Sequence, residues 1–356
     1  MPSSTSSFER PIPDRPWGRL LTITLILVTC ATIAWEVRAR AVGYAPTLND
    51  TPDLWAQQRG KVRPDSLVIV GDSRPLFDLD LDGLESGLGR RPIQLALPGS
   101  CAFPVLADLA ADPTYRGTVI CSIVPLMFFA PGGPLVENSE KALKRYHRWT
   151  LAQRSGHALG VLLEEHIAFL KQEDLTLNQL LQQLPIPNRP YAGVGPPLPP
   201  YFQTMDRERR TRMTEACAQP GPLQDRVKHG WLPLFTPPPP PSYVPKEAFL
   251  ESMGKAVEKR FRDTVDAVKK IEGRGGRVVF VRFPVSGKLK EHEDRMTPRA
   301  GPWTRLLADT GAPGIYFEDF PELASYELPE WSHLSGPQSV EFTARLVPHL
   351  KQALAR

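Results

Sequence analysis

The chain has 356 residues, of which 41% are hydrophobic and 23% are charged, and its formal net charge is +4. A chain of this length can bury a full core, so a small disulfide-stapled protein and a wholly disordered chain are both excluded. Acidic and basic residues are interspersed and no nucleic-acid-binding motif is found, so no nucleic-acid partner is expected.

The four cysteines, Cys30, Cys101, Cys121 and Cys217, form no CxxC pair, so the sequence predicts no zinc site. Cys30 lies in an apolar run, and one disulfide bond among the other three is left open. The glycines form neither a phosphate-binding loop nor a dinucleotide fingerprint. We therefore expect no metal and no cofactor.

The first predicted element is a membrane anchor. Residues 20–35 contain no charge, and Trp17 and Trp35 occupy the positions of interfacial aromatic residues. The sequence thus divides its N-terminal part into a leader at 1–19, a transmembrane anchor at 20–36 and a stalk or lead-in helix at 37–64.

The number of arginines is nearly the same on the two sides of the apolar run, so charge does not decide the membrane orientation. The orientation is predicted instead from the lengths of the chain before and after the run. A short N-terminal tail and a large C-terminal domain favour an N-in, C-out orientation. We expect a single-pass protein of the inner (cell) membrane with its main domain outside the cytoplasm, in the periplasm. A cleaved signal peptide and a buried core helix are the alternatives.

After the anchor, short apolar runs alternate with helical patterns. Such alternation is typical of a parallel sheet between two helical layers, so we predict the α/β class with a three-layer α/β/α sandwich. The pattern predicts strands at 67–70, 93–97, 118–124, 277–283 and 315–317. It predicts helices at 79–90, 105–111, 246–271, 303–308 and 339–354.

A long insertion at 130–244 separates the two parts of this domain, which are predicted at 65–129 and 245–356. Its first half is expected to be helical over about 138–184. Its second half favours polyproline II, because prolines crowd at 185–190, 196–200 and 237–241. Two interpretations are left open: a lid over the site, or a surface excursion that docks loosely.

Two short segments carry the candidate chemistry. Gly71-Asp72-Ser73 follows a predicted buried strand, and a serine at a strand-to-helix turn presents its hydroxyl at the carboxyl end of the sheet. Glu330-Trp331-Ser332-His333 places a carboxylate three residues before a histidine. A serine, a histidine base and an orienting carboxylate are the groups that acyl transfer needs. Ser73, His333 and Glu330 are therefore the candidate catalytic residues.

Each of these groups also has a purely structural interpretation. Gly-Asp-Ser is a common turn tripeptide. The alternative for His333 is a role in capping the terminal helix, with Ser332 or Ser335 as the N-cap residue of that helix. The alternatives to the proposed acid are Glu327 and Asp319.

The two segments together resemble the SGNH/GDSL hydrolase superfamily. With its anchor, and with Ser-His-Leu before the last helix, the chain resembles more narrowly the members that acylate or deacylate cell-surface polysaccharides. The resemblance covers 65–125 and 245–350 and implies a flavodoxin-like parallel sheet. It implies that Ser73 is the nucleophile, His333 the base and Glu330 the orienting acid.

The oxyanion donors are also implied by the resemblance. Gly99, in Leu97-Pro-Gly-Ser100, matches the second family block, so its backbone N–H and that of Ser73 are the expected donors. The family usually has an asparagine after the third strand, where this chain has none, and Ser122 or a backbone N–H is the expected substitute. The family also usually has Asp as the acid, one methylene shorter than Glu330. Loss of one oxyanion donor typically costs about 100- to 1000-fold in rate.

We therefore expect a membrane-anchored SGNH-like serine esterase or O-acyltransferase that acts on an extracytoplasmic glycan through a Ser-His-acid triad. Its expected partners are a glycan or acyl-ester substrate, the membrane and a membrane-bound acyltransferase. The alternative is a non-catalytic SGNH-like domain that binds or assembles with a membrane acyltransferase or polysaccharide export machinery.

Overall fold

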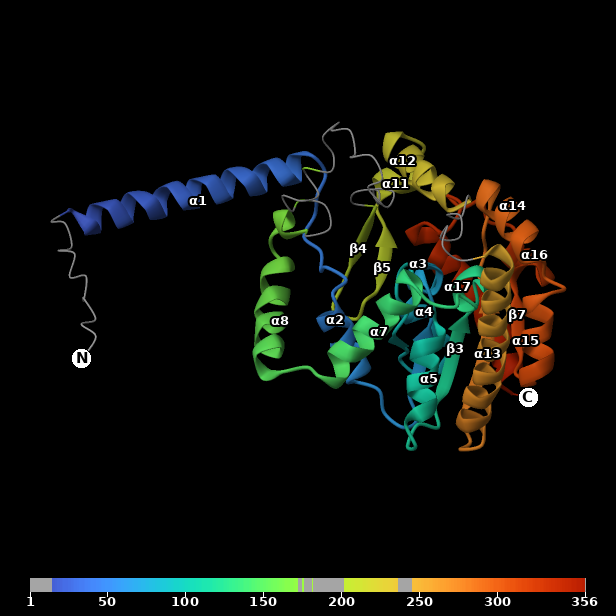
Figure 1. Ribbon diagram of the computed structural model, residues 1–356. Coiled ribbons are helices and arrows are strands. Elements are labelled where there is room, and N and C mark those ends of the chain that lie inside the picture. Colours follow the sequence, from blue (N-terminus) through green and yellow to red (C-terminus); the bar gives the residue numbers. More distant parts are fainter. Residues whose placement is uncertain (1–14, 172–174, 176–180, 182–201, 236–244, 356) are drawn as a thin grey trace, which may run out of the picture.

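The computed structural model describes residues 15–171, 175, 181, 202–235 and 245–355 (Figure 1). Most of the leader and all three proline-dense segments of the insertion therefore lie outside the described residues, as does most of the chain between 172 and 184. In Figure 1 the first helix, α1 (Trp17–Ala41), projects away from a body built around one central sheet.

Five parallel strands form the central sheet, which confirms the predicted parallel α/β architecture. Their order across the sheet is β2-β1-β3-β6-β7. If these five strands alone are numbered along the chain, the order is 2-1-3-4-5. The order reverses between β1 and β3, and ligands bind outside the strand ends at such a switch point. The strands are β1 (Leu67–Val70), β2 (Ile93–Gln94), β3 (Thr118–Ser122), β6 (Arg277–Arg282) and β7 (Gly314–Tyr316).

The strand sequences are runs of aliphatic residues bounded by turns. β1 reads Leu-Val-Ile-Val and is buried at every position, as expected for a strand covered on both faces. β2 is shorter than predicted. The backbone N–H groups of Leu95 and Leu97 nevertheless continue to bond Ile69 and Gly71, so the segment runs beside β1 up to the turn that follows it.

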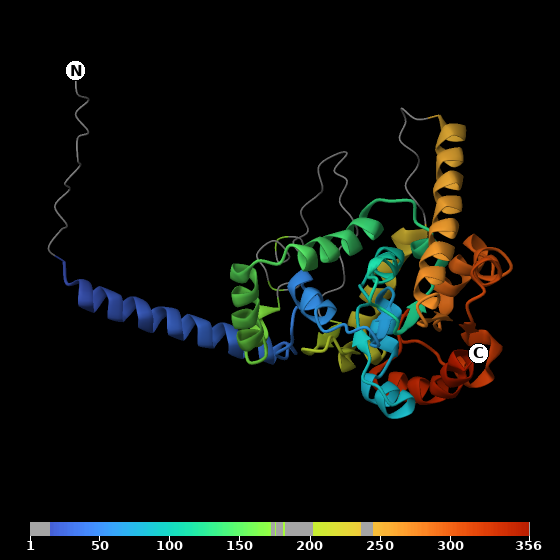
Figure 2. The ribbon, with the colours of Figure 1, turned by 90° about the horizontal axis from the view of Figure 1, so that it is seen from below.

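Helices cover both faces of the sheet (Figures 1 and 2). One layer holds α5 (Phe103–Ala111), α13 (Lys246–Glu272) and α15 (Pro302–Thr310). The other holds α3 (Ser73–Asp78), α4 (Leu81–Leu88) and α17 (Gly336–Leu354). The remaining elements are α6 (Pro125–Phe128), α14 (Gly287–Met296), η3 (Phe317–Asp319) and α16 (Pro321–Ala324). α14 has no counterpart among the predicted helices, because charged residues fill most of its length.

α1 is longer than the predicted span at 20–36. In the described part of the chain it is the one helix long and apolar enough to cross a membrane, with a mean hydropathy of 2.0 over its best window. None of that window is buried against protein, so the alternative of a buried core helix is excluded. An apolar helical stretch of this length that is exposed on every side has the character of a membrane span.

The segment at 37–64, predicted as a stalk or lead-in helix, contributes to the folded body. It contains α2 (Pro52–Arg59), whose N-cap Thr51 accepts a hydrogen bond from the Leu54 N–H. Trp55 is fully buried, and its Nε1 donates to Leu95 O at 2.9 Å. Leu48 and Asn49, just before α2, are also buried, and the Leu48 N–H donates to Met205 O at 3.0 Å. The prediction of a free stalk is therefore wrong for the residues from 47 onward.

The described part of the insertion consists of short helices and one hairpin. Two helices and a 3-10 turn come first, followed by an antiparallel pair of strands and a second group of helices. These elements are α7 (Pro134–His147), α8 (Leu151–Glu164), η1 (Ala168–Leu170), β4 (Gln203–Met205), β5 (Thr211–Met213), α11 (Glu215–Ala218), α12 (Pro222–Trp231) and η2 (Leu232–Phe235).

These elements dock firmly on the body. Met205 and Val227 share a second buried cluster with Phe77 of the main domain. Arg209, in the turn of the hairpin, is fully buried and donates to both carboxylate oxygens of Asp50 at 2.8 Å. The interpretation of the insertion as a loosely docked excursion is therefore wrong for residues 202–235.

A buried ion cluster ties three elements together beneath the candidate site. Glu293 of α14 accepts hydrogen bonds from Arg74 of α3, at 2.5 and 3.2 Å, and from Arg282 at the end of β6. Burial raises the pKa of Glu293, but the charges and hydrogen bonds of the two arginines outweigh this effect and lower its pKa to about 2. Glu293 is therefore ionised between two buried cations.

We expect Glu293→Gln to lower the free energy of unfolding by about 3–5 kcal/mol, because two buried guanidinium groups lose their carboxylate partner. Chemical denaturation of the full chain in detergent micelles measures the change. The stabilisation by Glu293 is present above pH 4.5, the unfolded pKa, and is lost as the pH falls through about 2, so the variant should lack this acid-dependent loss.

The control for this experiment is Glu258→Gln, which removes an exposed ion pair with Arg305 and should change stability little. Equal stability of the two variants would contradict the role given to Glu293.

Candidate active site

The turn between β1 and α3 places Ser73 at the carboxyl edge of the sheet, beside the switch point. Asp72 is the N-cap of α3 and accepts a backbone N–H of the first turn at 2.7 Å, so its role is structural. At Gly71 a Cβ atom would come within 2.5 Å of Pro75 Cγ and 2.6 Å of Ser122 Cβ. Only glycine fits there, and this close packing against β3 determines where Ser73 lies.

Ser73, His333 and Glu330 form one hydrogen-bonded chain. His333 Nε2 lies 2.7 Å from Ser73 Oγ, and His333 Nδ1 lies 2.7 Å from Glu330 Oε1. Glu330 is 0% and His333 1% exposed, whereas Ser73 is partly exposed. The structure thus brings together the three candidate catalytic residues, with the serine at the open end. A carboxylate on one ring nitrogen leaves the other nitrogen placed to accept the serine proton.

The loop that carries His333 is held by close packing. Trp331 has a φ of +76°, which is uncommon for a residue other than glycine. It packs on Gly287, where a Cβ atom would come within 2.5 Å of the indole ring. Ser335, and not Ser332, is the N-cap of α17, in a capping box. His333 is therefore not needed at the helix cap, and its ring is turned toward Ser73.

Glu330 is the carboxylate at this site, and the two alternatives lie elsewhere. Asp319 bonds Arg299 at 2.6 and 2.7 Å on the surface, and Glu327 is exposed. The additional methylene of Glu330, relative to the usual aspartate, does not prevent its hydrogen bond to the imidazole.

Aromatic side chains enclose His333, and two of them come from the insertion. Phe77 of α3 stacks on the imidazole with ring centroids 4.3 Å apart, and the rings of Phe202 and Trp231 lie at 6.2 and 6.1 Å. Trp231 Nε1 also donates to Glu330, at 2.7 Å to Oε2 and at 2.9 Å to the backbone oxygen. Residues 202–235 of the insertion therefore cover the histidine and the acid, as the lid interpretation predicts.

Sequence reasoning missed Trp231 as a residue of this site. It precedes Glu330 by 99 residues and belongs to no motif. Its only local signal is an aromatic residue at the end of an amphipathic helix, which predicts burial but no partner. The contact depends on how the insertion folds back.

Two further buried carboxyl groups lie beside the hydrogen-bonded chain. Asp78 accepts the Leu334 N–H at 2.8 Å through Oδ1, and its buried Oδ2 has no hydrogen-bond partner among the described residues. Burial raises the pKa of Asp78 well above its usual range, and the nearby charges of Glu330 and Asp72 raise it further. Burial also raises the pKa of Asp72. A neutral Asp78 holds the backbone after His333 without placing a second full negative charge near Glu330.

Gly99 lies at the same sheet edge as Ser73. It follows Leu97, whose N–H bonds Gly71 O at 2.9 Å, and it is exposed with a φ of +57°. Its carbonyl oxygen accepts a hydrogen bond at 3.2 Å from Asn138 Nδ2 of α7, a contact that the sequence did not indicate. The first helix of the insertion thus helps to hold the Gly99 turn.

Ser122, the expected substitute for the family's asparagine, lies under the turn that carries Ser73. It is 1% exposed, and its Oγ has no hydrogen-bond partner within the described ranges. Because the Cβ atom of Ser122 packs against Gly71 and its Oγ is buried, the hydroxyl does not reach the open edge. The backbone N–H groups of Ser73 and Gly99 are thus the better candidates for oxyanion donors.

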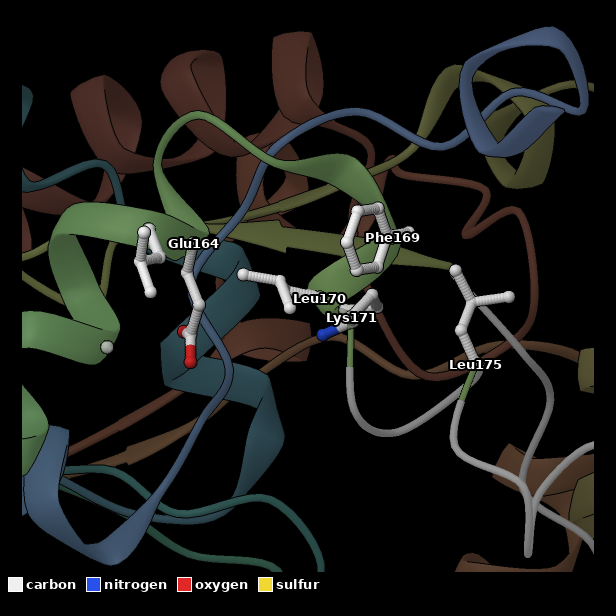
Figure 3. A pocket seen from close by; sticks show the side chains of 7 residues that line it. Glu164, Phe169, Leu170, Lys171 and Leu175 are labelled. Carbon is white, nitrogen blue, oxygen red and sulfur yellow. The ribbon is translucent and has the colours of Figure 1, made fainter. Parts of the chain in front are cut away.

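The pocket in Figure 3 lies apart from this site. Residues of α8 and η1, among them Glu164 and Phe169, and the adjoining Lys171 line its volume of about 310 Å³. Across the described residues, no group of three or more histidine, cysteine or carboxylate side chains is placed to hold a metal ion. All four cysteines are free thiols, so the disulfide bond left open by the sequence is not formed.

Comparison with known proteins finds no family model, no curated protein and no solved structure that matches this chain. The function proposed below is therefore argued from the geometry of the site.

We expect the stability of the protein to fall as the pH rises above about 4, because the unfolded chain releases the Asp78 proton near pKa 3.8 while the folded state retains it. Asp78→Asn removes this titration and keeps an acceptor oxygen for Leu334. The free energy of unfolding of the variant should therefore fall less between about pH 4 and pH 8 than that of the wild type.

Denaturation of the full chain across this pH range measures the two slopes. Asp82→Asn, which removes an exposed carboxylate of α4, is the matched control and should keep the wild-type slope. Parallel slopes for Asp78→Asn and the wild type would show that Asp78 is ionised in the folded state.

Proposed function

We propose that this protein is a membrane-anchored serine esterase or O-acyltransferase of the SGNH type that acts on a glycan outside the cytoplasm. The observation that carries the proposal is the chain Ser73–His333–Glu330, with a hydrogen bond of 2.7 Å at each link. This arrangement activates a serine hydroxyl for attack on an ester carbonyl.

Four features of the fold support the SGNH type. The serine follows the first strand of a parallel sheet, and the histidine lies just before the last helix. The strand order, 2-1-3-4-5 along the chain, is the flavodoxin-like order. The site lies at the switch point of that order, where doubly wound sheets bind their ligands.

In the first half of the proposed reaction, Ser73 Oγ attacks the carbonyl carbon of the ester while His333 Nε2 takes the hydroxyl proton. The negative charge on the carbonyl oxygen is stabilised by the backbone N–H groups of Ser73 and Gly99. The bond to the alcohol then breaks, and His333 returns the proton to the departing oxygen. The acyl group is left as an ester of Ser73.

In the second half, His333 takes a proton from the incoming acceptor, whose oxygen attacks the acyl-serine. Ser73 leaves and regains its proton from the imidazolium. Water as the acceptor gives hydrolysis, and a sugar hydroxyl gives acyl transfer. In both halves Glu330 orients the imidazole and stabilises its positive charge.

The anchor supports the proposed location. α1 is apolar along the segment that would cross the inner membrane, and the body follows it in the chain. In the N-in orientation the body lies on the periplasmic side. A cell-surface glycan and a membrane-bound acyltransferase are the partners that this position favours.

A second candidate function is a non-catalytic SGNH-like domain that binds or assembles with a membrane acyltransferase or polysaccharide export machinery. It is favoured by one observation, the burial of Ser122 at the position where the family has its asparagine donor. The two candidates differ in whether Ser73 reacts.

We expect the full-length protein in detergent to react with a fluorophosphonate probe at Ser73 and to hydrolyse a chromogenic acetyl ester. Ser73→Ala should abolish labelling and lower turnover by about 1000-fold or more, because the nucleophile is lost. Ser252→Ala, at an exposed serine whose hydroxyl donates to the Phe249 carbonyl of its own helix, is the control and should retain both activities. Equal turnover by Ser73→Ala and the wild type would leave the non-catalytic function as the better one.

We expect Trp231→Phe to lower kcat by about 10- to 100-fold, because Glu330 loses a charge-assisted hydrogen bond of about 1.5–3 kcal/mol while the aromatic packing is kept. Trp149→Phe is the matched control, since its buried Nε1 has no hydrogen-bond partner among the described residues. An unchanged kcat in a folded Trp231→Phe protein would show that the lid does not position the acid.

A further inference from the structure

We propose that α8 lies flat in the lipid interface of the membrane that α1 spans, with its exposed apolar face against the bilayer. This inference rests on α1 as a membrane span and is independent of the esterase activity.

The side chains of α8 are distributed in the opposite way to those of an ordinary surface helix. Its large apolar residues point outward: Leu151 is 81%, Leu159 59%, Leu162 52% and Leu163 43% exposed. A surface helix of a globular domain turns such residues toward the core. Within the described part of the chain, the outward face of α8 therefore lacks the partner that its composition requires.

Polar side chains of α8 face the body instead. His157 Nε2 lies 2.9 Å from Gln57 Oε1, and Glu164 Oε2 accepts the Asn49 N–H at 2.9 Å. Val161, on the same inward side, is the residue of α8 in the second buried cluster. These contacts fix the rotation of the helix, so the leucines cannot turn inward.

Arg154, in the first half of the helix, is the one charged residue among the exposed positions of α8. The other exposed positions are Leu151, Ala152, Ser155, Gly156, Ala158, Leu159, Leu162 and Leu163. An exposed face with so little charge is costly in water but suits the boundary between headgroups and acyl chains.

The end of α1 is attached to the segment directly after α8. The Glu36 carboxylate accepts the N–H groups of Ala168 and Phe169, each at 3.1 Å, and Arg40 Nη2 donates to His166 O at 3.0 Å. Glu36 is also where the apolar run of α1 ends. The boundary of the span and the C-terminal end of α8 are therefore at the same level.

The orientation of α8 matches a membrane surface. In Figures 1 and 2, α8 runs across the axis of α1 and is the part of the body nearest to the side from which α1 projects. A bilayer crossed by α1 along its normal would therefore have its surface along α8. The leucines are exposed and point away from the body, so in this arrangement the bilayer surface is their proposed partner.

Neighbouring features fit the same surface. Leu163 is shared with the pocket of Figure 3, whose other apolar lining includes Phe169 and Leu170 beside the α1 attachment. Arg148 and Arg154 are exposed at the N-terminal end of α8, where they can pair with anionic headgroups. The occupant of this face is thus the surface of an anionic phospholipid bilayer.

The experiment places single nitroxide spin labels on the full-length protein in nanodiscs of phosphatidylethanolamine and phosphatidylglycerol. Leu159→Cys in a Cys30→Ser background reports on α8, and native Cys30 reports on α1. Cys101, Cys121 and Cys217 are fully buried and should not react. Leu250→Cys, also with Cys30→Ser, is the control, because Leu250 is 58% exposed on α13, far from α1 in both views.

We expect the label at 159 to collide more often with oxygen, which partitions into lipid, than with a water-soluble nickel complex, and the label at 250 to show the reverse ratio. Native Cys30 should be lipid-immersed. The proposal is overturned if the label at 159 is as accessible to the nickel complex as the label at 250. It is also overturned if the label at 159 is shielded from both oxygen and the nickel complex, because protein would then cover the face. A Cys30 label outside lipid also overturns it, and leaves the Ser73 experiments unaffected.

Discussion

The parallel pairing of β1, β3 and β6 is the constraint on which the rest of the structure depends. It brings the carboxyl ends of these strands to one edge, where Gly71 packs so closely on Ser122 that no side chain fits between them. Ser73 begins the helix that follows. Arg282, at the end of β6, shares Glu293 with Arg74, so the same edge is fastened from beneath by a buried ion cluster. A histidine 260 residues away can therefore meet a serine whose position is already determined.

The insertion connects this edge to the proposed membrane surface. At one end Trp231 and Phe202 close over His333, and Trp231 bonds the second oxygen of Glu330. At the other end the segment after α8 bonds the last turns of α1. Phe77 links the two ends, since it stacks on the imidazole and shares a buried cluster with Val161 of α8. In the proposed function, anchor, lid and triad form one packed unit, so the distance of the site from the bilayer is fixed by side-chain packing.

Sequence patterns predicted the central domain well, because its elements have strong local periodicity. The aliphatic run of β1 and the amphipathic pattern of α13 lie where expected, and α17 begins near its predicted start. The pattern failed where burial does not show in composition. α14 is mostly charged, yet Glu293 is buried because two arginines neutralise it. The segment at 37–64 suggested a connector, but Trp55 inserts into the core.

By itself, the sequence determined the α/β class, the apolar N-terminal helix and the nomination of Ser73, His333 and Glu330, because each depends on residues close together in the chain. Only the tertiary structure decided that Glu330, and not Glu327 or Asp319, reaches the imidazole. It alone decided that Ser122 is buried and that the insertion covers the site. These outcomes depend on contacts between residues far apart in sequence, whose partners are selected by packing and by the need to satisfy buried polar groups.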